Sequence, residues 1–140
     1  MIVSNFRRSI LMVLAIALST VCGSGLSGAE GFLGRYYSNT NLSGAPALTR
    51  VDPTINFNWG SLSPATGVPT DNFSVRWVGY LTPPTSGIWT FTTASDDGIS
   101  LVVNGQTIVR DGTAHAVKEQ SGSIELQAGV PVLVDLTYYE

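Results

Sequence analysis

The sequence predicts an all-β fold, either a β-sandwich or a closed barrel, that follows a helical signal peptide. Three observations lead to this prediction. After residue 30 apolar and polar residues alternate, turn-forming residues recur at short intervals, and no segment has the period of an amphipathic helix. About seven short strands separated by such turns are typical of sandwiches and barrels.

The first 29 residues differ from the rest of the chain. Arg7 and Arg8 precede a continuous apolar run over residues 9–21, and small residues follow it. A basic start, a short apolar run and a small-residue site are the three parts of a secretory signal. The run is also too short to cross a bilayer of about 30 Å as a helix, although an uncleaved membrane anchor remains the alternative. We therefore expect residues 1–29 to be a signal peptide, cleaved after Ala29.

Cleavage at this position would leave residues 30–140 as one secreted or cell-surface domain with no membrane span. Cys22 would be removed, so the mature domain would depend on its core rather than on disulfides. Loss of Arg7 and Arg8 leaves five Lys and Arg against ten Asp and Glu, a net charge of −5. An acidic surface repels phosphate backbones, so we expect no nucleic-acid partner.

The first expected strands are two short ones, residues 32–37 and 54–59. The clearest strand is residues 72–82, where apolar side chains fall on one face: Phe73, Val75, Trp77 and Leu81. Period two over this length predicts a half-buried strand, which places Trp77 in the core. Two prolines and a glycine within residues 83–87 then end the strand.

The later strands are separated by clearer turns. Residues 88–93 are β-branched and aromatic, as strands prefer. Residues 99–103 and 106–110 flank Asn104-Gly105, which predicts a hairpin because both turn positions favour positive φ. Residues 123–127 and 132–139 are expected to form one more pair around a proline- and glycine-containing turn.

Few residues of the chain are suited to catalysis. His115 is the one histidine, and a mature domain without cysteine offers little for nucleophilic or zinc chemistry. No serine lies in a Gly-x-Ser-x-Gly motif, and the carboxylates are too scattered for the acid–base pair of a glycosidase. We expect no enzyme here; any catalysis would lie in other domains of a longer parent protein.

Asp96 and Asp97 form an acidic pair that is followed by Gly98, between two expected strands. Adjacent carboxylates beside a glycine that permits a sharp turn offer hard oxygen ligands to calcium (Ca2+). The alternative is a turn in which both side chains accept hydrogen bonds from local amides, as Asx residues do.

Aromatic residues supply the other candidates for ligand binding, because a ring can stack on a sugar. Trp77 and Trp89 align with apolar neighbours and are expected in the core. Trp59 precedes Gly60 in a loop-like setting and is therefore the remaining ligand-binding candidate. His115 is expected to make structural hydrogen bonds, and Arg76 a structural ion pair.

Several blocks, in order along residues 31–140, resemble the protective-antigen, or PA-fourteen, family. They are GRYY (34–37), VDPTI (51–55), FNWG (57–60), NFSVRWVGY (72–80), TSGIWTF (85–91), SDDGI (95–99), LVVNG (101–105) and YYE (138–140). The resemblance implies a lectin-like β-sandwich or barrel module found in toxins, glycosidases, proteases and adhesins. In the family the chain continues past the last block into a final strand, so residues 30–140 resemble a C-terminally truncated member.

The resemblance also bears on the metal. Some members bind sugars through a calcium ion held by an Asp-Asp pair, which favours Asp96 and Asp97 as calcium ligands. The second loop that completes the ion in those lectins has no residue-by-residue match here. The prediction is thus a secreted or cell-surface carbohydrate-binding module, calcium-dependent, that attaches a multidomain parent to glycans or cell-surface polysaccharide. The alternative is a structural or protein-interaction module without a sugar ligand, as in toxin segments.

Overall fold

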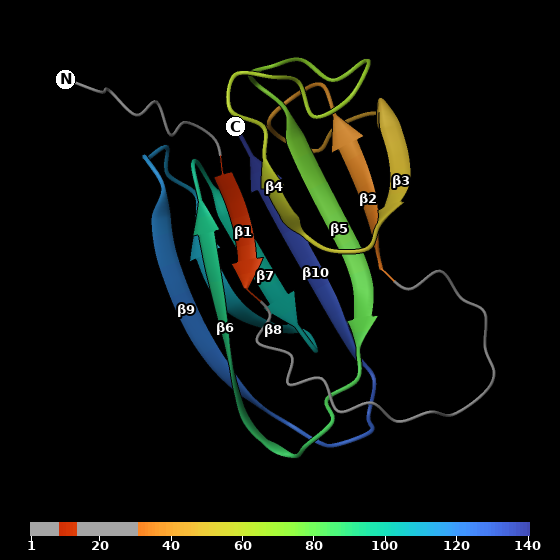
Figure 1. Ribbon diagram of the computed structural model, residues 1–140, viewed down its shortest axis with the longest axis vertical. Coiled ribbons are helices and arrows are strands. Elements are labelled where there is room, and N and C mark those ends of the chain that lie inside the picture. The colour runs from red at the N-terminus through yellow and green to blue at the C-terminus, as the bar shows by residue number, and fades with distance from the viewer. Residues whose placement is uncertain (1–8, 14–30) are drawn as a thin grey trace.

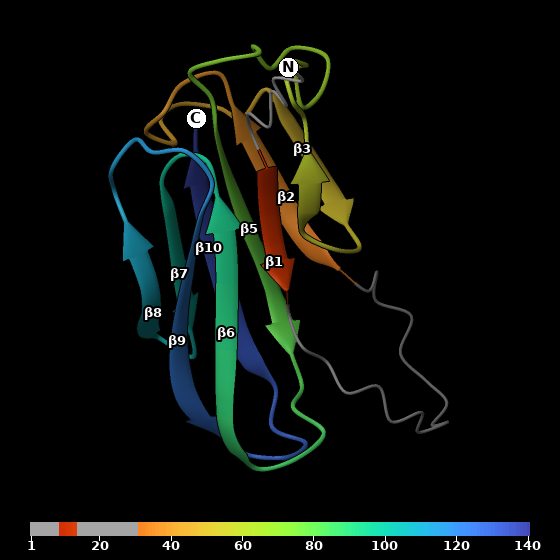
Figure 2. The ribbon, with the colours of Figure 1, turned by 60° about the vertical axis from the view of Figure 1, so that its left-hand side comes forward.

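The computed structural model describes residues 9–13 and 31–140. These residues form ten strands in two antiparallel sheets, one of six strands and one of four. Figure 1 and Figure 2 together show the two sheets as the layers of a sandwich. The all-β prediction is therefore confirmed. No helix among the described residues is long and apolar enough to cross a membrane.

The six-stranded sheet has the order β3-β2-β5-β10-β7-β8. Its strands are β2 (Phe32–Tyr37), β3 (Leu48–Asp52), β5 (Ser74–Leu81), β7 (Ile99–Val103), β8 (Gln106–Asp111) and β10 (Val132–Tyr139). Strand β10 lies between β5 and β7, with Leu136 opposite both Trp77 and Leu101. All three side chains are fully buried. One face of this sheet therefore forms the core and the other faces solvent.

The four-stranded sheet has the order β4-β1-β6-β9. Its strands are β1 (Ser9–Val13), β4 (Asn56–Asn58), β6 (Gly87–Ser95) and β9 (Lys118–Leu126). The backbone of Leu11 lies opposite Asn56 on one side and Ala94 on the other. The segment that the sequence places in a helical signal peptide is thus extended over Ser9–Val13. The rest of that predicted peptide lies outside the described residues.

The local strand predictions are largely confirmed. Strands β2, β7 and β10 have the expected bounds, and the β7–β8 turn has positive φ at both Asn104 and Gly105. Strand β3 was not expected from the sequence. Its inward positions include Arg50 and Asp52, so it lacks the apolar alternation that reveals a strand.

The expected pairing of residues 123–127 with residues 132–139 is wrong. Strand β9 pairs with β6 in the smaller sheet, whereas β10 pairs with β5 and β7 in the larger one. The connection between them crosses from one sheet to the other. Its Gly129 donates a backbone hydrogen bond to Pro83 in the β5–β6 connection at 2.8 Å, instead of closing a hairpin.

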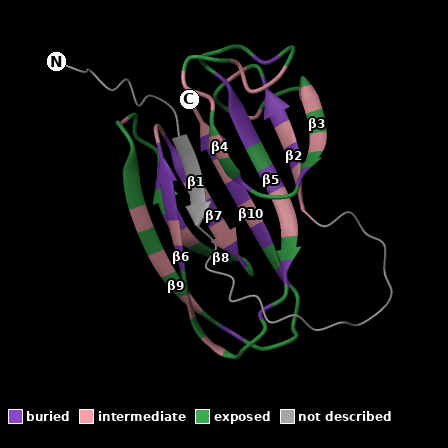
Figure 3. Cartoon of the chain, in the orientation of Figure 1, coloured by how far each residue is buried: buried purple, intermediate pink, exposed green. Residues whose placement is uncertain are grey.

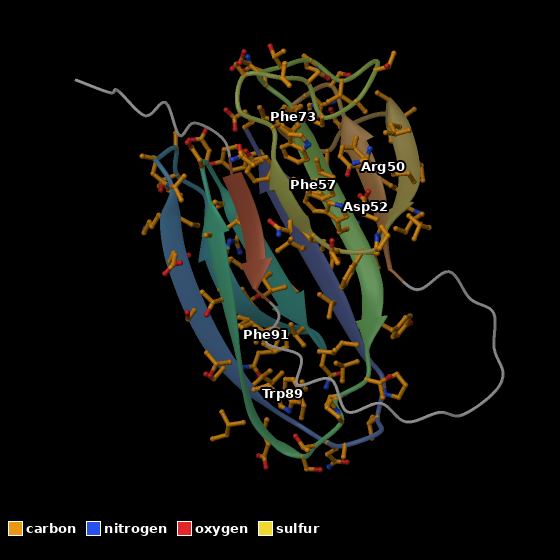
Figure 4. All side chains as sticks on the ribbon, in the orientation of Figure 1. Arg50, Asp52, Phe57, Phe73, Trp89 and Phe91 are labelled. Atoms are coloured by element: carbon orange, nitrogen blue, oxygen red, sulfur yellow. The ribbon has the colours of Figure 1, made fainter. Side chains whose placement is uncertain are left out.

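Buried residues concentrate on β5, β7 and β10, while β9 is mostly half-buried or exposed (Figure 3). Trp77 is 0% exposed, which confirms its predicted core position. Its indole N–H donates to the buried carboxylate of Asp52 at 2.8 Å. Figure 4 shows Asp52 beside Arg50 at one edge of the six-stranded sheet, and Arg50 Nε donates to Asp52 Oδ1 at 2.6 Å. Burial and the neighbouring Asp52 raise the pKa of the Tyr36 phenol, which also donates to this carboxylate.

Candidate functional site

Polar side chains gather at one end of the sandwich, where three segments meet. They are the Asp96–Gly98 connection between β6 and β7, the residue 112–117 connection between β8 and β9, and the end of β10. Figure 1 shows this end near the label C. Residues from distant parts of the sequence are therefore brought around the Asp96-Asp97 pair.

Tyr139 fixes the Asp96–Gly98 connection to β10. The backbone N–H of Tyr139 donates to the Gly98 carbonyl at 3.0 Å. A Cβ atom added to Gly98 would lie 2.0 Å from the Tyr139 ring, far inside normal contact. Residue 98 has to be glycine for the ring to pack on the backbone, so the connection and the aromatic ring share one rigid arrangement.

The hydroxyl of Tyr138 lies beside the Glu140 carboxylate and near the charges of Asp96 and Asp97. The hydroxyl lies within hydrogen-bond distance of the Asp96 carbonyl and of Glu140 Oε2, and its single proton can go to one of them. Burial raises the pKa of the Tyr138 phenol, and the negative charges of Glu140, Asp97 and Asp96 raise it further. The surroundings of this hydroxyl are therefore strongly negative.

Asp97 is tied to the residue 112–117 connection, because its Oδ1 accepts the backbone N–H of His115 at 2.9 Å. The His115 ring is largely buried, and its Nε2 lies 3.3 Å from Asp111 Oδ2. That nitrogen makes no hydrogen bond of acceptable geometry within the described part of the chain. The backbone N–H of His115 and its ring Nδ1, which lies 2.9 Å from the Ala116 carbonyl, make hydrogen bonds of the structural kind expected from the sequence.

The carboxylate of Asp111 links the residue 112–117 connection to strand β9. Its carboxylate accepts hydrogen bonds from the Lys118 ammonium at 2.8 Å, the Gln120 amide at 2.6 Å, and both the hydroxyl and the backbone N–H of Thr113. The Lys118 contact, followed by those of Thr113, holds the pKa of Asp111 well below its usual range. Sequence reasoning missed Asp111, because it becomes central only when β8 lies beside β9.

A calcium ion takes 6–8 oxygen ligands, of which the half-buried Asp96 and Asp97 would supply part. Glu140 supplies a carboxylate at the Tyr138 hydroxyl, which also lies at the backbone carbonyl of Asp96. In residues 9–13 and 31–140 no group of three His, Cys, Asp or Glu residues has the spacing of a metal site. The donor types suit calcium, and the calcium site stays a prediction.

Of the other residues singled out from the sequence, Trp59 lies against the ring of Tyr138, with 6.0 Å between centroids. The ring of Trp59 stacks on Phe57 at 5.0 Å between centroids and meets Phe73 edge-on at 5.4 Å. Trp59 is thus half-buried in an aromatic cluster, and its role as a sugar platform is untested. Trp89 donates to the Thr85 carbonyl and packs against the core. Arg76 forms the predicted ion pair, with two hydrogen bonds to Asp135.

An antiparallel two-sheet sandwich with polar connections gathered at one end is the form of a small β-sandwich module. Residues 28–140 match the family model of the PA14 domain. The chain therefore belongs to the PA14 domain family, as the sequence resemblance indicated.

Two similar proteins are anti-sigma factors. The chain is 36% identical over 111 residues to the anti-sigma-I factor RsgI3 of Acetivibrio thermocellus, an alignment of 79% of this chain but 17% of that protein. A solved anti-sigma factor domain-containing protein has 35% identity and a TM-score of 0.76, over 79% of this chain and 38% of that one. The chain thus spans less than two-fifths of either.

A third similar structure is the PA14 sugar-binding domain from an RTX adhesin. It has 20% identity and a TM-score of 0.56, over 79% of this chain and 82% of that one. At this identity the likeness concerns the fold alone.

Proposed function

We propose that residues 31–140 form a carbohydrate-binding module that works outside the cell as one part of a longer protein. The observation that carries the proposal is the end of the sandwich at Asp96–Gly98. There Tyr139 fixes the connection to β10, the Glu140 carboxylate meets the Tyr138 hydroxyl, and the charges of Asp96 and Asp97 lie nearby. Rigid connections that present polar groups on a stable sandwich are a common design for binding sites.

Calcium is the cofactor in this proposal. Asp96 and Asp97 would hold the ion, because hard carboxylate oxygens are the ligands that calcium prefers. The concentration of negative charge around Tyr138 favours a cation at this end. When bound, the ion would supply a charged centre for sugar hydroxyl groups, while the hydrogen bond from His115 to Asp97 keeps the connection in place.

The relatives support an extracellular recognition role within a larger chain. One structural neighbour is the PA14 sugar-binding domain from an RTX adhesin, and the chain covers only part of the anti-sigma factors that it resembles. Export would depend on the predicted signal peptide, residues 1–29. The competing function is a structural or protein-interaction module with no sugar ligand.

A glycan array probed with the protein, once in calcium and once in chelator, separates the two functions. The proposal predicts selective glycan signals that chelator removes. The variant Asp96→Asn with Asp97→Asn should lose those signals while keeping its far-ultraviolet circular dichroism spectrum. If a folded protein bound no glycan in calcium, the interaction-module function would replace this one.

A further inference from the structure

The outer face of the six-stranded sheet is positive although the domain is acidic. Five cations remain after residue 29, and three of them, Arg35, Arg76 and Arg110, lie in one row across this face. Strand register gives the row: Arg35 lies opposite Arg76, Arg76 opposite Thr137, Thr137 opposite Ser100, and Ser100 opposite Arg110. Cations and hydroxyl groups are thus collected on one surface of a domain with a net charge of −5.

Only one of these arginines has a carboxylate partner among the described residues. Arg76 is neutralised by Asp135, at 3.0 and 2.6 Å, whereas no described carboxylate lies within ion-pair distance of Arg35 or Arg110. Like charges directly opposite one another, as Arg35 and Arg76 are, are unfavourable in a sheet. The row therefore has excess positive charge that an anion would relieve.

The Arg110 end of the row contains a pocket of about 120 Å³. Its lining includes Ser100, Thr137, Arg110 and Tyr139, together with the acidic residue Asp111, above the backbone of Gly98. A drug-sized ligand needs a pocket of roughly 300–1,000 Å³, so this one suits a single small unit of a longer ligand. Two hydroxyl groups, a guanidinium group and an aromatic ring are suited to a sugar that carries an acidic group.

Two carboxylates lie near Arg110, and each has a hydrogen-bond partner of its own. Asp111, which also lines the pocket, is the next residue on β8, and because successive side chains of a strand point to opposite faces, its carboxylate is turned to the buried side. There it is held by Lys118, Gln120 and Thr113. Asp97 accepts the backbone N–H of His115, and its charge, like that of Asp111, raises the pKa of the Tyr139 phenol at the pocket.

We propose that this pocket is a subsite for a carboxylated sugar unit, with the Arg110 guanidinium binding the carboxylate and Ser100, Thr137 and Tyr139 contacting the sugar. Gly98 is shared with the Asp96-Asp97 connection, so the binding surface continues from the end of the sandwich onto the outer face of the sheet. The inference rests on the proposed carbohydrate-binding function and names the class of sugar.

Chemical-shift mapping of the isotope-labelled full chain tests the subsite. Glucuronate and galacturonate are compared with glucose and galactose, which differ only at the acidic group, and acetate serves as the bare carboxylate. Uronates should shift the amides of Ser100, Arg110 and Thr137. Arg110→Gln should weaken their binding about tenfold, the loss expected for one charge-assisted hydrogen bond.

Arg35→Gln is the matched control, because it removes the same charge from the same row. Four strand spacings separate Arg35 from Arg110, about 19 Å, which is beyond the reach of one sugar unit. This variant should therefore bind uronates as the wild type does. An equal loss in both variants would mean general attraction to a positive face and would overturn the subsite.

Three other outcomes would also overturn it. Equal shifts with acetate would indicate an anion site with no sugar specificity. Shifts by neutral sugars alone, or shifts by uronates that Arg110→Gln leaves unchanged, would reject the acidic subsite while leaving carbohydrate binding intact. If no sugar shifted any amide and the glycan array were also blank, the proposed function would fall together with the subsite.

Discussion

The indole N–H of Trp77 on β5 donates to the Asp52 carboxylate on β3, at 2.8 Å, across the intervening strand β2. Gly34 on β2 makes this reach possible. A Cβ atom at Gly34 would lie 2.6 Å from Asp52 Oδ2 and 3.0 Å from Trp77 Nε1. A buried aromatic residue, a buried acid and a glycine on three adjacent strands thus fix the strand order at one edge of the sandwich.

We predict that Asp52→Ala lowers the free energy of unfolding by about 3–5 kcal/mol, the usual cost of breaking a buried charged pair. The variant leaves the Trp77 N–H and the Tyr36 hydroxyl without their acceptor. Urea unfolding followed by tryptophan fluorescence measures the change. Asp135→Ala breaks an exposed pair with Arg76 and should cost less than about 1 kcal/mol. Equal losses of unfolding free energy in the two variants would contradict the structural role of the buried Asp52 carboxylate.

The packing of Tyr139 on Gly98 gives a second prediction. Gly98→Ala places a methyl group inside the ring, and overpacking of this kind costs about 1–3 kcal/mol. Gly112→Ala, in the neighbouring connection, meets no atom within 4 Å and should change stability by less than about 0.5 kcal/mol.

The double variant Gly98→Ala with Tyr139→Ala identifies the cause. If the clash is with the ring, Tyr139→Ala should recover part of the stability that Gly98→Ala loses, and thermal melting measures the recovery. Strictly additive losses would place the strain elsewhere in the connection.

Strand β1 gives a third prediction. A central strand uses every backbone N–H in its ladders, and proline has none, so Leu11→Pro should lower the free energy of unfolding by more than about 1 kcal/mol. Hydrogen exchange should become faster in β4 and β6, the two strands that flank β1. Leu11→Ala keeps the N–H and serves as the control. Unchanged exchange in Leu11→Pro would mean that β1 does not support its neighbours.

Mass spectrometry of the exported protein tests the expected cleavage after Ala29. A mature chain that begins at Glu30 would lack β1, so β4 and β6 would need another partner strand. The intact mass of the exported protein is expected to correspond to a start at Glu30. A mass that includes residues 9–13 would instead assign β1 to the working protein.

Asp111 gives the fourth prediction, which concerns pH. Because its pKa is lowered in the folded protein, its contribution to stability is present above the unfolded pKa of about 3.9 and is lost as the pH falls below that value. The wild type should therefore lose stability through this acidic range more steeply than Asp111→Asn. Glu125→Gln removes an exposed charge on β9 and should follow the wild type. Identical pH profiles for the wild type and Asp111→Asn would rule out the stabilising role of Asp111.

Local chemistry explains which parts of the fold were predictable. The Asn104-Gly105 turn defines its hairpin without help from distant residues, and the alternation around Trp77 identifies β5. The pairing of β9 with β6 could not be predicted in this way. The chain crosses from one sheet to the other because of tertiary packing, and the turn at Gly129 does not determine it. Strand β3 was missed because Asp52 can be buried only through contacts with Tyr36 and Trp77.

The same distinction holds for the site. Asp96 and Asp97 are adjacent in sequence, so their shared position was visible without a structure. The role of Arg110 could not be predicted from the sequence. The row of side chains that includes it exists only when β8, β7, β10, β5 and β2 lie side by side. The surroundings of Asp111 likewise depend on Lys118 and Gln120 of β9, a strand of the other sheet.

The most direct test of the central claim is titration calorimetry with the strongest ligand from the glycan array, in millimolar calcium and in chelator. The account predicts that the wild type binds in calcium, that chelator weakens binding at least about tenfold, and that Asp96→Asn with Asp97→Asn binds as weakly in calcium as the wild type does in chelator. The control Asp71→Asn, an exposed acid on another connection, should bind as the wild type does. Glycan binding that neither chelator nor the double variant reduced would contradict a calcium-dependent site at Asp96 and Asp97.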